Sequence, residues 1–315
     1  MSATTFKSLP RKSGISTRHT VFALAVAASA GLFWKPLTAL VSLCLHGDSY
    51  SHILLIPFIT LYIFWTERSA IFREVRSSAV SWVSGLTLIV AGIAISWFAD
   101  PRLNLPAASY NLTAAIFGLL VIWLGAFIVC YGIRTARFAL FPWMFLLLMV
   151  PLPEAILSRI IAALQRGSVD VSMSLFKMCG VPVLRQGVLL SVPGVTIEVA
   201  KECSSIRSSM ALFITCVLAS RFYLRSFWKQ ALFVLLSLPL SVVKNGIRIT
   251  TLTLLSLYVN PGFLHGDLHR DGGFVFFFLA LAILWPVLGA LRRSESRPTK
   301  VTANGIHRGS EAITS

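Results

Sequence analysis

The sequence is poor in charge. Only 13% of its 315 residues are Asp, Glu, Lys or Arg, whereas 56% are hydrophobic and the mean hydropathy is +0.78. This apolar content is far higher than a water-soluble protein needs to form its core, so an ordinary soluble fold is excluded. Acidic residues are especially few, at 12 against 28 Lys and Arg. The composition indicates that lipid is the solvent for most of the chain.

Cysteine is scarce as well. The five cysteines show no CxxC spacing and no companion histidine cluster, so we expect no metal site and no cofactor. Three lie within apolar runs and are expected to pack as small core residues; they are Cys44, Cys130 and Cys216. Cys179 and Cys203 fall in a segment that we expect outside the cytoplasm, where a disulfide between them is chemically permitted.

Long apolar runs dominate what remains. They span about 19–45, 51–66, 80–98, 110–131, 138–151, 204–220, 230–259 and 273–291. A helix needs about 20 residues to cross the hydrocarbon of a bilayer. We therefore predict an all-α polytopic membrane protein with about eight transmembrane helices, the first of them a retained helix and not a cleaved signal peptide.

Three of these runs leave alternatives open. Runs 51–66 and 138–151 are short, and each is either a crossing or a buried or re-entrant segment. Run 230–259 is too long for a simple crossing and too short for two, and we expect one broken or tilted crossing. Pro239 and Asn245-Gly246 are its plausible break points.

The net charge of +16 would suggest a nucleic-acid partner in a soluble protein, but here the basic residues mark orientation. Most of them fall in segments that are cytoplasmic if the N-terminus is cytoplasmic and the chain crosses eight times. We predict basic cytoplasmic tails at 1–18 and 292–315, a single transmembrane domain at 19–291, and location in the cell inner membrane. No nucleic-acid partner is expected.

The sizeable segment outside the membrane, 152–203, is predicted to face outward. Apolar residues at helical spacing from Glu154 to Cys179 indicate an amphipathic helix lying in the interface. The alternating residues that follow predict a short β-hairpin turning at Pro193-Gly194. This hairpin leads the chain to Cys203.

Three residues are candidates for catalysis: Cys203, Arg248 and His269. A cap by Ser204 or Ser205 would place the Cys203 thiol at the positive end of a helix dipole, which favours the nucleophilic thiolate. His269 follows on the same outward side and can act as its general acid and base. Arg248 is a costly charge within an apolar run and could stabilise an oxyanion. The set is typical of acyl transfer through a thioester.

Each residue also has a simpler interpretation. The simpler interpretation of Cys203 is a small residue at a helix start, and that of Arg248 is a structural partner of Glu198 or Asp267. His265 rivals His269 by proximity. The alternative function is a polytopic transporter in which Arg248 and His269 line a substrate path, although no internal repeat is visible.

Several short motifs resemble those of the exosortase/archaeosortase family. They are the Cys-Ser-Ser-Ile-Arg-Ser stretch at 203–208, Asn-Gly-Ile-Arg at 245–248, and the His269 segment before a Phe-rich helix. Upstream, Asp-Ser-Tyr-Ser-His at 48–52 looks like the first conserved block of that family, and the proline-rich region at 142–153 looks like another. The resemblance covers about 46–291.

This resemblance implies a membrane-embedded cysteine protease and transpeptidase. Its substrates would be exported proteins with a C-terminal sorting signal made of a short motif such as Pro-Glu-Pro, a transmembrane helix and a basic tail. Cys203 would be the nucleophile, His269 the general acid and base, and Arg248 the transition-state stabiliser, with His52 in a supporting role. Membrane lipid and proteins of an exopolysaccharide system are further implied partners. The commonest family motif has glycine where this chain has Ser205, which leaves the subtype open.

Overall fold

The computed structural model describes residues 13–46, 50–98, 108–198, 206–260 and 273–295. The chain forms two compact units, Met1–Ile160 and Ile161–Ser315.

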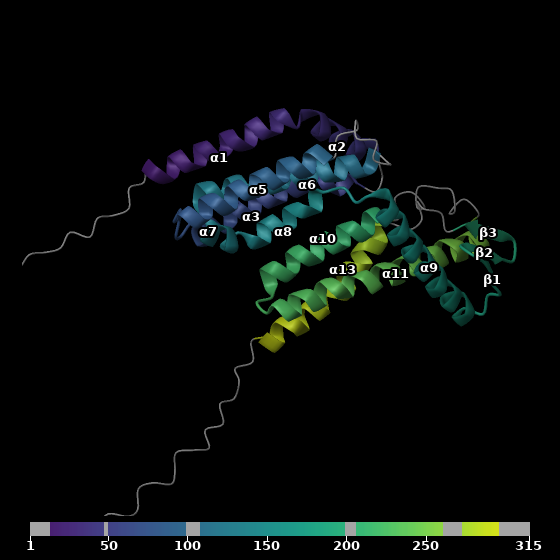
Figure 1. The fold of residues 1–315 in the computed structure, drawn as a ribbon. Helices are drawn as coiled ribbons and strands as arrows, with labels where there is room; N and C mark the ends of the chain where they lie inside the picture. The colour runs from purple at the N-terminus through teal and green to yellow at the C-terminus, as the bar shows by residue number, and fades with distance from the viewer. Residues whose placement is uncertain (1–12, 47–49, 99–107, 199–205, 261–272, 296–315) are drawn as a thin grey trace, which may run out of the picture. The chain divides into compact units, whose positions relative to one another are not determined.

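The described residues of the first unit form helices joined by turns, with no strand among them (Figure 1). Its elements are α1 (Ser13–Leu32), α2 (Trp34–His46), the 3₁₀ helix η1 (Ser51–Leu55), α3 (Ile56–Thr66), α4 (Arg68–Ile71), α5 (Ala79–Phe98), α6 (Ala108–Tyr131), α7 (Ile133–Phe138), α8 (Leu140–Leu146) and η3 (Leu147–Met149). Its core is rich in aromatic rings. Phe127 and Tyr131 on α6 lie with ring centroids 4.7 Å apart, and Phe64 and Trp143 pack against Phe127.

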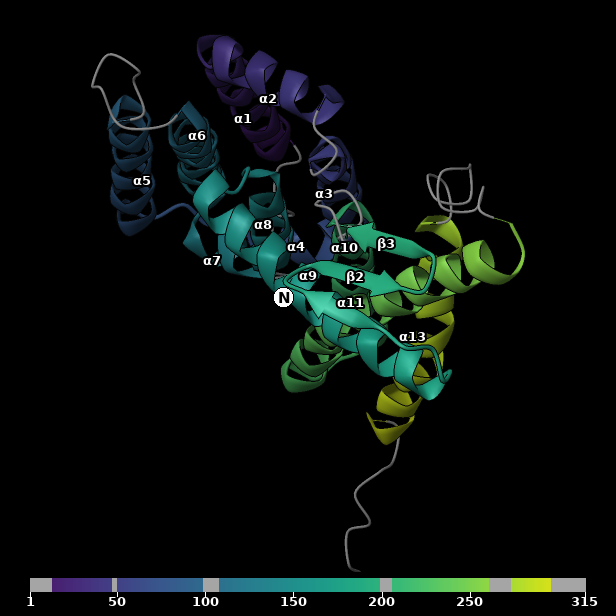
Figure 2. The ribbon, with the colours of Figure 1, turned by 90° about the vertical axis from the view of Figure 1, so that its right-hand side faces the viewer.

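Helices α5 and α6 pack side by side along their length (Figures 1 and 2). Glycines on each helix face the backbone of the other. A Cβ added at Gly92 would lie 2.6 Å from the carbonyl oxygen of Gly118, and one added at Gly85 would lie 2.8 Å from that of Gly125. Small residues let membrane helices approach to backbone contact in this way.

The second unit combines helices with a small sheet. Its elements are most of α9 (Glu154–Met178), then β1 (Leu184–Gln186), β2 (Leu189–Val192), β3 (Val195–Glu198), α10 (Ile206–Tyr223), α11 (Phe227–Tyr258) and α13 (Gly273–Glu295). Figure 2 shows the sheet beside α9 and α11. A buried cluster joins them: Val169 and Phe176 on α9, Leu190 and Val192 on β2, and Ile249 on α11.

The predicted hairpin is confirmed at its turn. Strands β2 and β3 pair antiparallel with Val192 opposite Val195, and Gly194 between them has φ +89°. The sheet has a third strand that the sequence pattern did not separate. β1 pairs antiparallel with β2 through a turn in which Gly187 has φ +65°, so the sheet order is β1-β2-β3. Both turns need the left-handed conformation that glycine adopts readily.

Four described helices are long and apolar enough to cross a membrane, and up to six spans result if each of two bent helix pairs counts as one. The four are Ala79–Trp97, Asn111–Tyr131, Phe227–Tyr258 and Phe274–Glu295. The chain is therefore a mainly helical, multi-pass membrane protein, and the count of eight stays a prediction. Run 19–45 is not one straight helix, because α1 and α2 meet at a bend of 77°.

Of the two alternatives for run 230–259, a broken or a tilted single crossing, the structure contradicts the broken one and agrees with one unbroken helix. α11 is one continuous helix of 32 residues that passes through Pro239, Asn245 and Gly246. Gly246 does not break the helix; its lack of a side chain lets α11 pack closely against α9. A Cβ added there would lie 2.5 Å from Cγ1 of Val171 on α9, and the hydroxyl of Ser172 donates to the Gly246 carbonyl at 3.2 Å.

Replacing Gly246 by alanine should therefore destabilise the second unit. Overpacking of this kind costs about 1–3 kcal/mol, because Val171 and the helix that carries it must move. The measurement is the thermal unfolding midpoint of the purified protein in detergent. Gly289→Ala on α13 is the matched control, since a Cβ there meets nothing within 4 Å. Equal midpoints for the two variants would contradict the packing argument.

Candidate functional site

The candidate site lies on a bundle formed by α10, α11 and α13 in the second unit. A buried apolar cluster joins the three helices, with Leu212 and Cys216 from α10, Phe233 from α11, and Ala280 and Leu284 from α13. These contacts pack the three helices into one bundle.

The ends of this bundle can be assigned from hydrogen bonds. The carboxylate of Glu295, at the end of α13, accepts from the backbone N–H groups of Arg225 and Ser226, in the turn between α10 and α11. The starts of α10 at Ile206 and of α13 at Gly273 therefore lie toward the same opposite end of the bundle, and the longer α11 extends past them (Figure 1).

A buried lysine connects α11 to the start of α10. Lys244 is only 2% exposed, and its ammonium group donates to the hydroxyl of Ser208 at 2.5 Å. A buried cation is costly without polar partners, so this contact helps to satisfy the ammonium group within an apolar helix pair. It also sets the rotation of the first turn of α10 against α11.

Two further contacts fix α11 against α9. The side-chain amide of Asn245 donates to the hydroxyl of Ser168 at 2.9 Å, and both residues are buried. The Ser172 hydroxyl donates to the Gly246 carbonyl, also from α9, and together with the Lys244 bond to α10 these contacts hold α11 on two sides just before Arg248. A guanidinium on a helix held in this way is positioned by the fold, as a preorganised electrostatic group must be.

Arg248 itself is half-buried and lies four residues after Lys244. Residues four apart share one face of a helix, so α11 presents two cations on the same face. Arg248 is also one turn closer than Lys244 to the bundle end where α10 and α13 begin. As a fork of five donors, its guanidinium suits a carboxylate or a developing oxyanion.

The other predicted site residues lie outside the described residues. Cys203 and the capping candidates Ser204 and Ser205 belong to 199–205, and His265 and His269 belong to 261–272. The structure describes Arg248 but does not test the grouping of the three residues. The helix starts that follow both segments, Ile206 and Gly273, lie at the same end of the bundle.

Sequence reasoning missed the supporting polar contacts. Ser208 belongs to the stretch 203–208 singled out above, and Lys244 is a charge within the apolar run 230–259, but nothing in the sequence pairs them. Ser168 and Ser172 are two polar residues within the predicted amphipathic helix. Their spacing could have indicated a contact with a neighbouring helix, because two serines at positions 168 and 172 share one helix face. Within the described ranges, no three His, Cys, Asp or Glu residues are placed to hold a metal ion.

The sequence matches a family model. Residues 44–286 match the model described as Transmembrane exosortase (Exosortase_EpsH), which covers most of the chain and both compact units. No curated protein and no solved structure matches the chain significantly.

Proposed function

The chain belongs to the transmembrane exosortase family, a family of membrane sorting transpeptidases, and from this membership we propose that it cleaves C-terminal sorting signals of exported proteins through a cysteine thioester. The signal would consist of a short motif, a transmembrane helix and a basic tail. Exported proteins are thus the proposed substrates, and proteins of an exopolysaccharide system are proposed as further partners.

The proposed reaction begins at Cys203. Its thiolate attacks the carbonyl carbon of the scissile peptide bond, and Arg248 stabilises the resulting oxyanion with its guanidinium donors. His269 takes the thiol proton and gives it to the departing amine as the C–N bond breaks. The thioester is then resolved by a second nucleophile, which transfers the substrate to a new acceptor.

One observation of the described helices supports this assignment. The starts of α10 and α13 directly follow the segments that contain Cys203 and His269, and both lie at one end of the bundle. Arg248 lies on α11 toward that same end. The proposed topology has both termini in the cytoplasm of a cell with an inner membrane, eight crossings and this end facing outward, where exported proteins are accessible.

Family membership also weighs against the transporter alternative, in which Arg248 and His269 would line a path across the membrane.

The transpeptidase proposal is tested by coexpressing a protein that carries a sorting signal with and without this chain. Loss of the C-terminal helix is followed as a mobility shift on a gel. A substrate that keeps its full length in the presence of the chain would refute the proposal.

The role of His269 yields a separate prediction. General acid and base catalysis by a positioned side chain contributes about 10²–10⁴-fold, so His269→Ala should slow processing by that factor. His265→Ala, four residues earlier, is the matched control and should process at a rate close to the wild type. The measurement is the rate of substrate cleavage after induction. The opposite ranking of the two variants would move the proton-transfer role to His265.

A further inference from the structure

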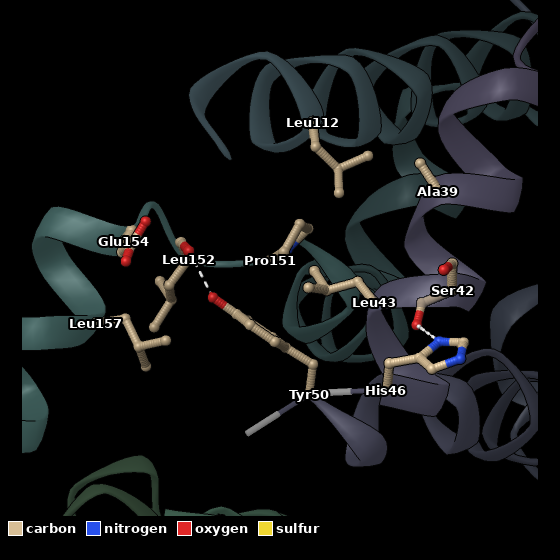
Figure 3. A pocket seen from close by; sticks show the side chains of 10 residues that line it. All are labelled: Ala39, Ser42, Leu43, His46, Tyr50, Leu112, Pro151, Leu152, Glu154 and Leu157. Atoms are coloured by element: carbon tan, nitrogen blue, oxygen red, sulfur yellow. Dashed lines mark hydrogen bonds between the residues drawn. The ribbon is translucent and has the colours of Figure 1, made fainter. Parts of the chain in front are cut away.

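Two of the motifs that carry the family resemblance contain none of the proposed catalytic residues. One is the block at 48–52, and the other is the proline-rich region at 142–153. In the first unit the two come together: the hydroxyl of Tyr50 donates to the backbone carbonyl of Leu152 at 3.1 Å. Figure 3 shows this contact at the wall of a pocket of about 700 Å³.

The pocket is mainly apolar with polar groups at its edge. It is lined by Ala39, Ser42, Leu43, His46, Tyr50, Leu112, Pro151, Leu152, Glu154 and Leu157. These residues come from the second half of α2, from Tyr50 just before η1, from the start of α6, from the turn after η3 and from the first turn of α9 (Figure 3). The volume is in the range of pockets that enclose most of a small ligand or a few peptide residues.

The polar groups of the pocket are left mainly as acceptors. The hydroxyl proton of Tyr50 is used by the Leu152 carbonyl, so its oxygen offers lone pairs. In His46, the Nδ1–H group donates to the Ser42 carbonyl at 2.9 Å, so that hydrogen is already used within α2. The Glu154 carboxylate accepts only. The Tyr50 oxygen and the Glu154 carboxylate therefore favour a ligand that donates hydrogen bonds, and the Ser42 hydroxyl can donate or accept.

The wall of the pocket is held in place before any ligand arrives. The Pro151 carbonyl accepts from the hydroxyl of Thr113 on α6 at 2.8 Å, and the next carbonyl, that of Leu152, accepts from Tyr50. Burial and the neighbouring Glu154 carboxylate raise the pKa of Tyr50, which keeps its hydroxyl protonated as a donor. Two prolines, Pro151 and Pro153, restrict the backbone of this turn. A preorganised wall reduces the ordering cost of binding.

We infer that this pocket binds an extended, apolar stretch of the substrate peptide that is free of acidic side chains. The inference rests on the proposed function. Backbone N–H groups of an extended peptide supply the donors that the acceptors at the edge require, and apolar side chains fill the floor. The Glu154 carboxylate repels an acidic residue at this position. A lipid tail would fill the floor but would leave these acceptors unused.

Photocrosslinking tests the occupant directly. A benzoylphenylalanine at position 112 in the full-length Cys203→Ala protein should form an adduct with a coexpressed substrate, identified by mass spectrometry. The control places the same group at Trp97, which is 72% exposed on α5 of the same unit and does not line the pocket. An adduct that contains lipid and no substrate, or equal substrate adducts at both positions, would overturn the inference.

Filling the pocket provides a second measurement. Leu157→Trp should reduce processing by about tenfold at low substrate expression, a loss typical of a missing apolar pocket contact, and higher expression should restore it. Ile156→Trp is the matched control, because Ile156 is exposed in the same helical turn and does not line the pocket. Equal rates for the two variants would overturn the inference. Failure of the proposed function would appear differently, as no processing by the wild type.

Discussion

Replacing Cys203 with alanine is expected to abolish processing of a coexpressed substrate, because no thioester can form without the thiol. The expected gel pattern is full-length substrate only, at a level of membrane-inserted enzyme equal to the wild type. Cys179→Ala is the matched control. Cys179 is exposed at the end of α9, and its removal should leave processing intact.

The thioester itself can be detected by a competing nucleophile. Hydroxylamine added to the wild-type reaction should capture the acyl group and release the processed protein with a C-terminal hydroxamate, which adds a defined mass to that peptide. The Cys203→Ala protein should yield no such product. Processing by Cys203→Ala, or hydroxamate formation without the thiol, would remove Cys203 as the nucleophile.

Replacing Arg248 with alanine is expected to slow processing by about 10²–10³-fold, the usual effect of removing one donor that stabilises an oxyanion. Arg248→Lys keeps the charge but loses the planar fork, so it should recover only part of this loss. Arg185→Ala is a suitable control, because Arg185 pairs with Asp170 at the sheet and is absent from the proposed mechanism.

A stability measurement separates catalysis from folding in the Arg248 series. If Arg248→Ala unfolds at the same temperature as the wild type in detergent yet processes slowly, the residue acts on the reaction. A full rate in Arg248→Ala would contradict the proposed role. A rate lost in proportion to a lowered unfolding temperature would assign Arg248 to the fold instead.

The sequence anticipated local features that depend on local chemistry. The turn at Pro193-Gly194 was predictable because few residues adopt the left-handed φ that Gly194 shows. The helix after Pro153 was predictable from its apolar spacing, and α9 begins at Glu154. The family was also recognisable from short motifs in their order along the chain, as the match over 44–286 confirms.

Features that depend on a partner element could not be predicted. Asn245-Gly246 looked like a helix break, because both residues have low helix propensity. The helix continues because Ser168 satisfies the Asn245 amide and Val171 fills the space beside Gly246. The bond between Lys244 and Ser208 likewise joins residues on different helices, and no periodicity in either helix reveals it.

The length of α11 has a consequence for where the chemistry takes place. Its 32 residues span about 48 Å at 1.5 Å per residue, well beyond the roughly 30 Å of hydrocarbon. Phe227 and Trp228 are exposed at its start, where aromatic side chains typically anchor a helix at the boundary of a bilayer. A span that begins there leaves the hydrocarbon about 20 residues later, close to Arg248. On that placement the guanidinium would lie at the level of the lipid headgroups, where water could reach the charged intermediate of the proposed reaction and where the transmembrane helix of the proposed sorting signal would emerge from the bilayer.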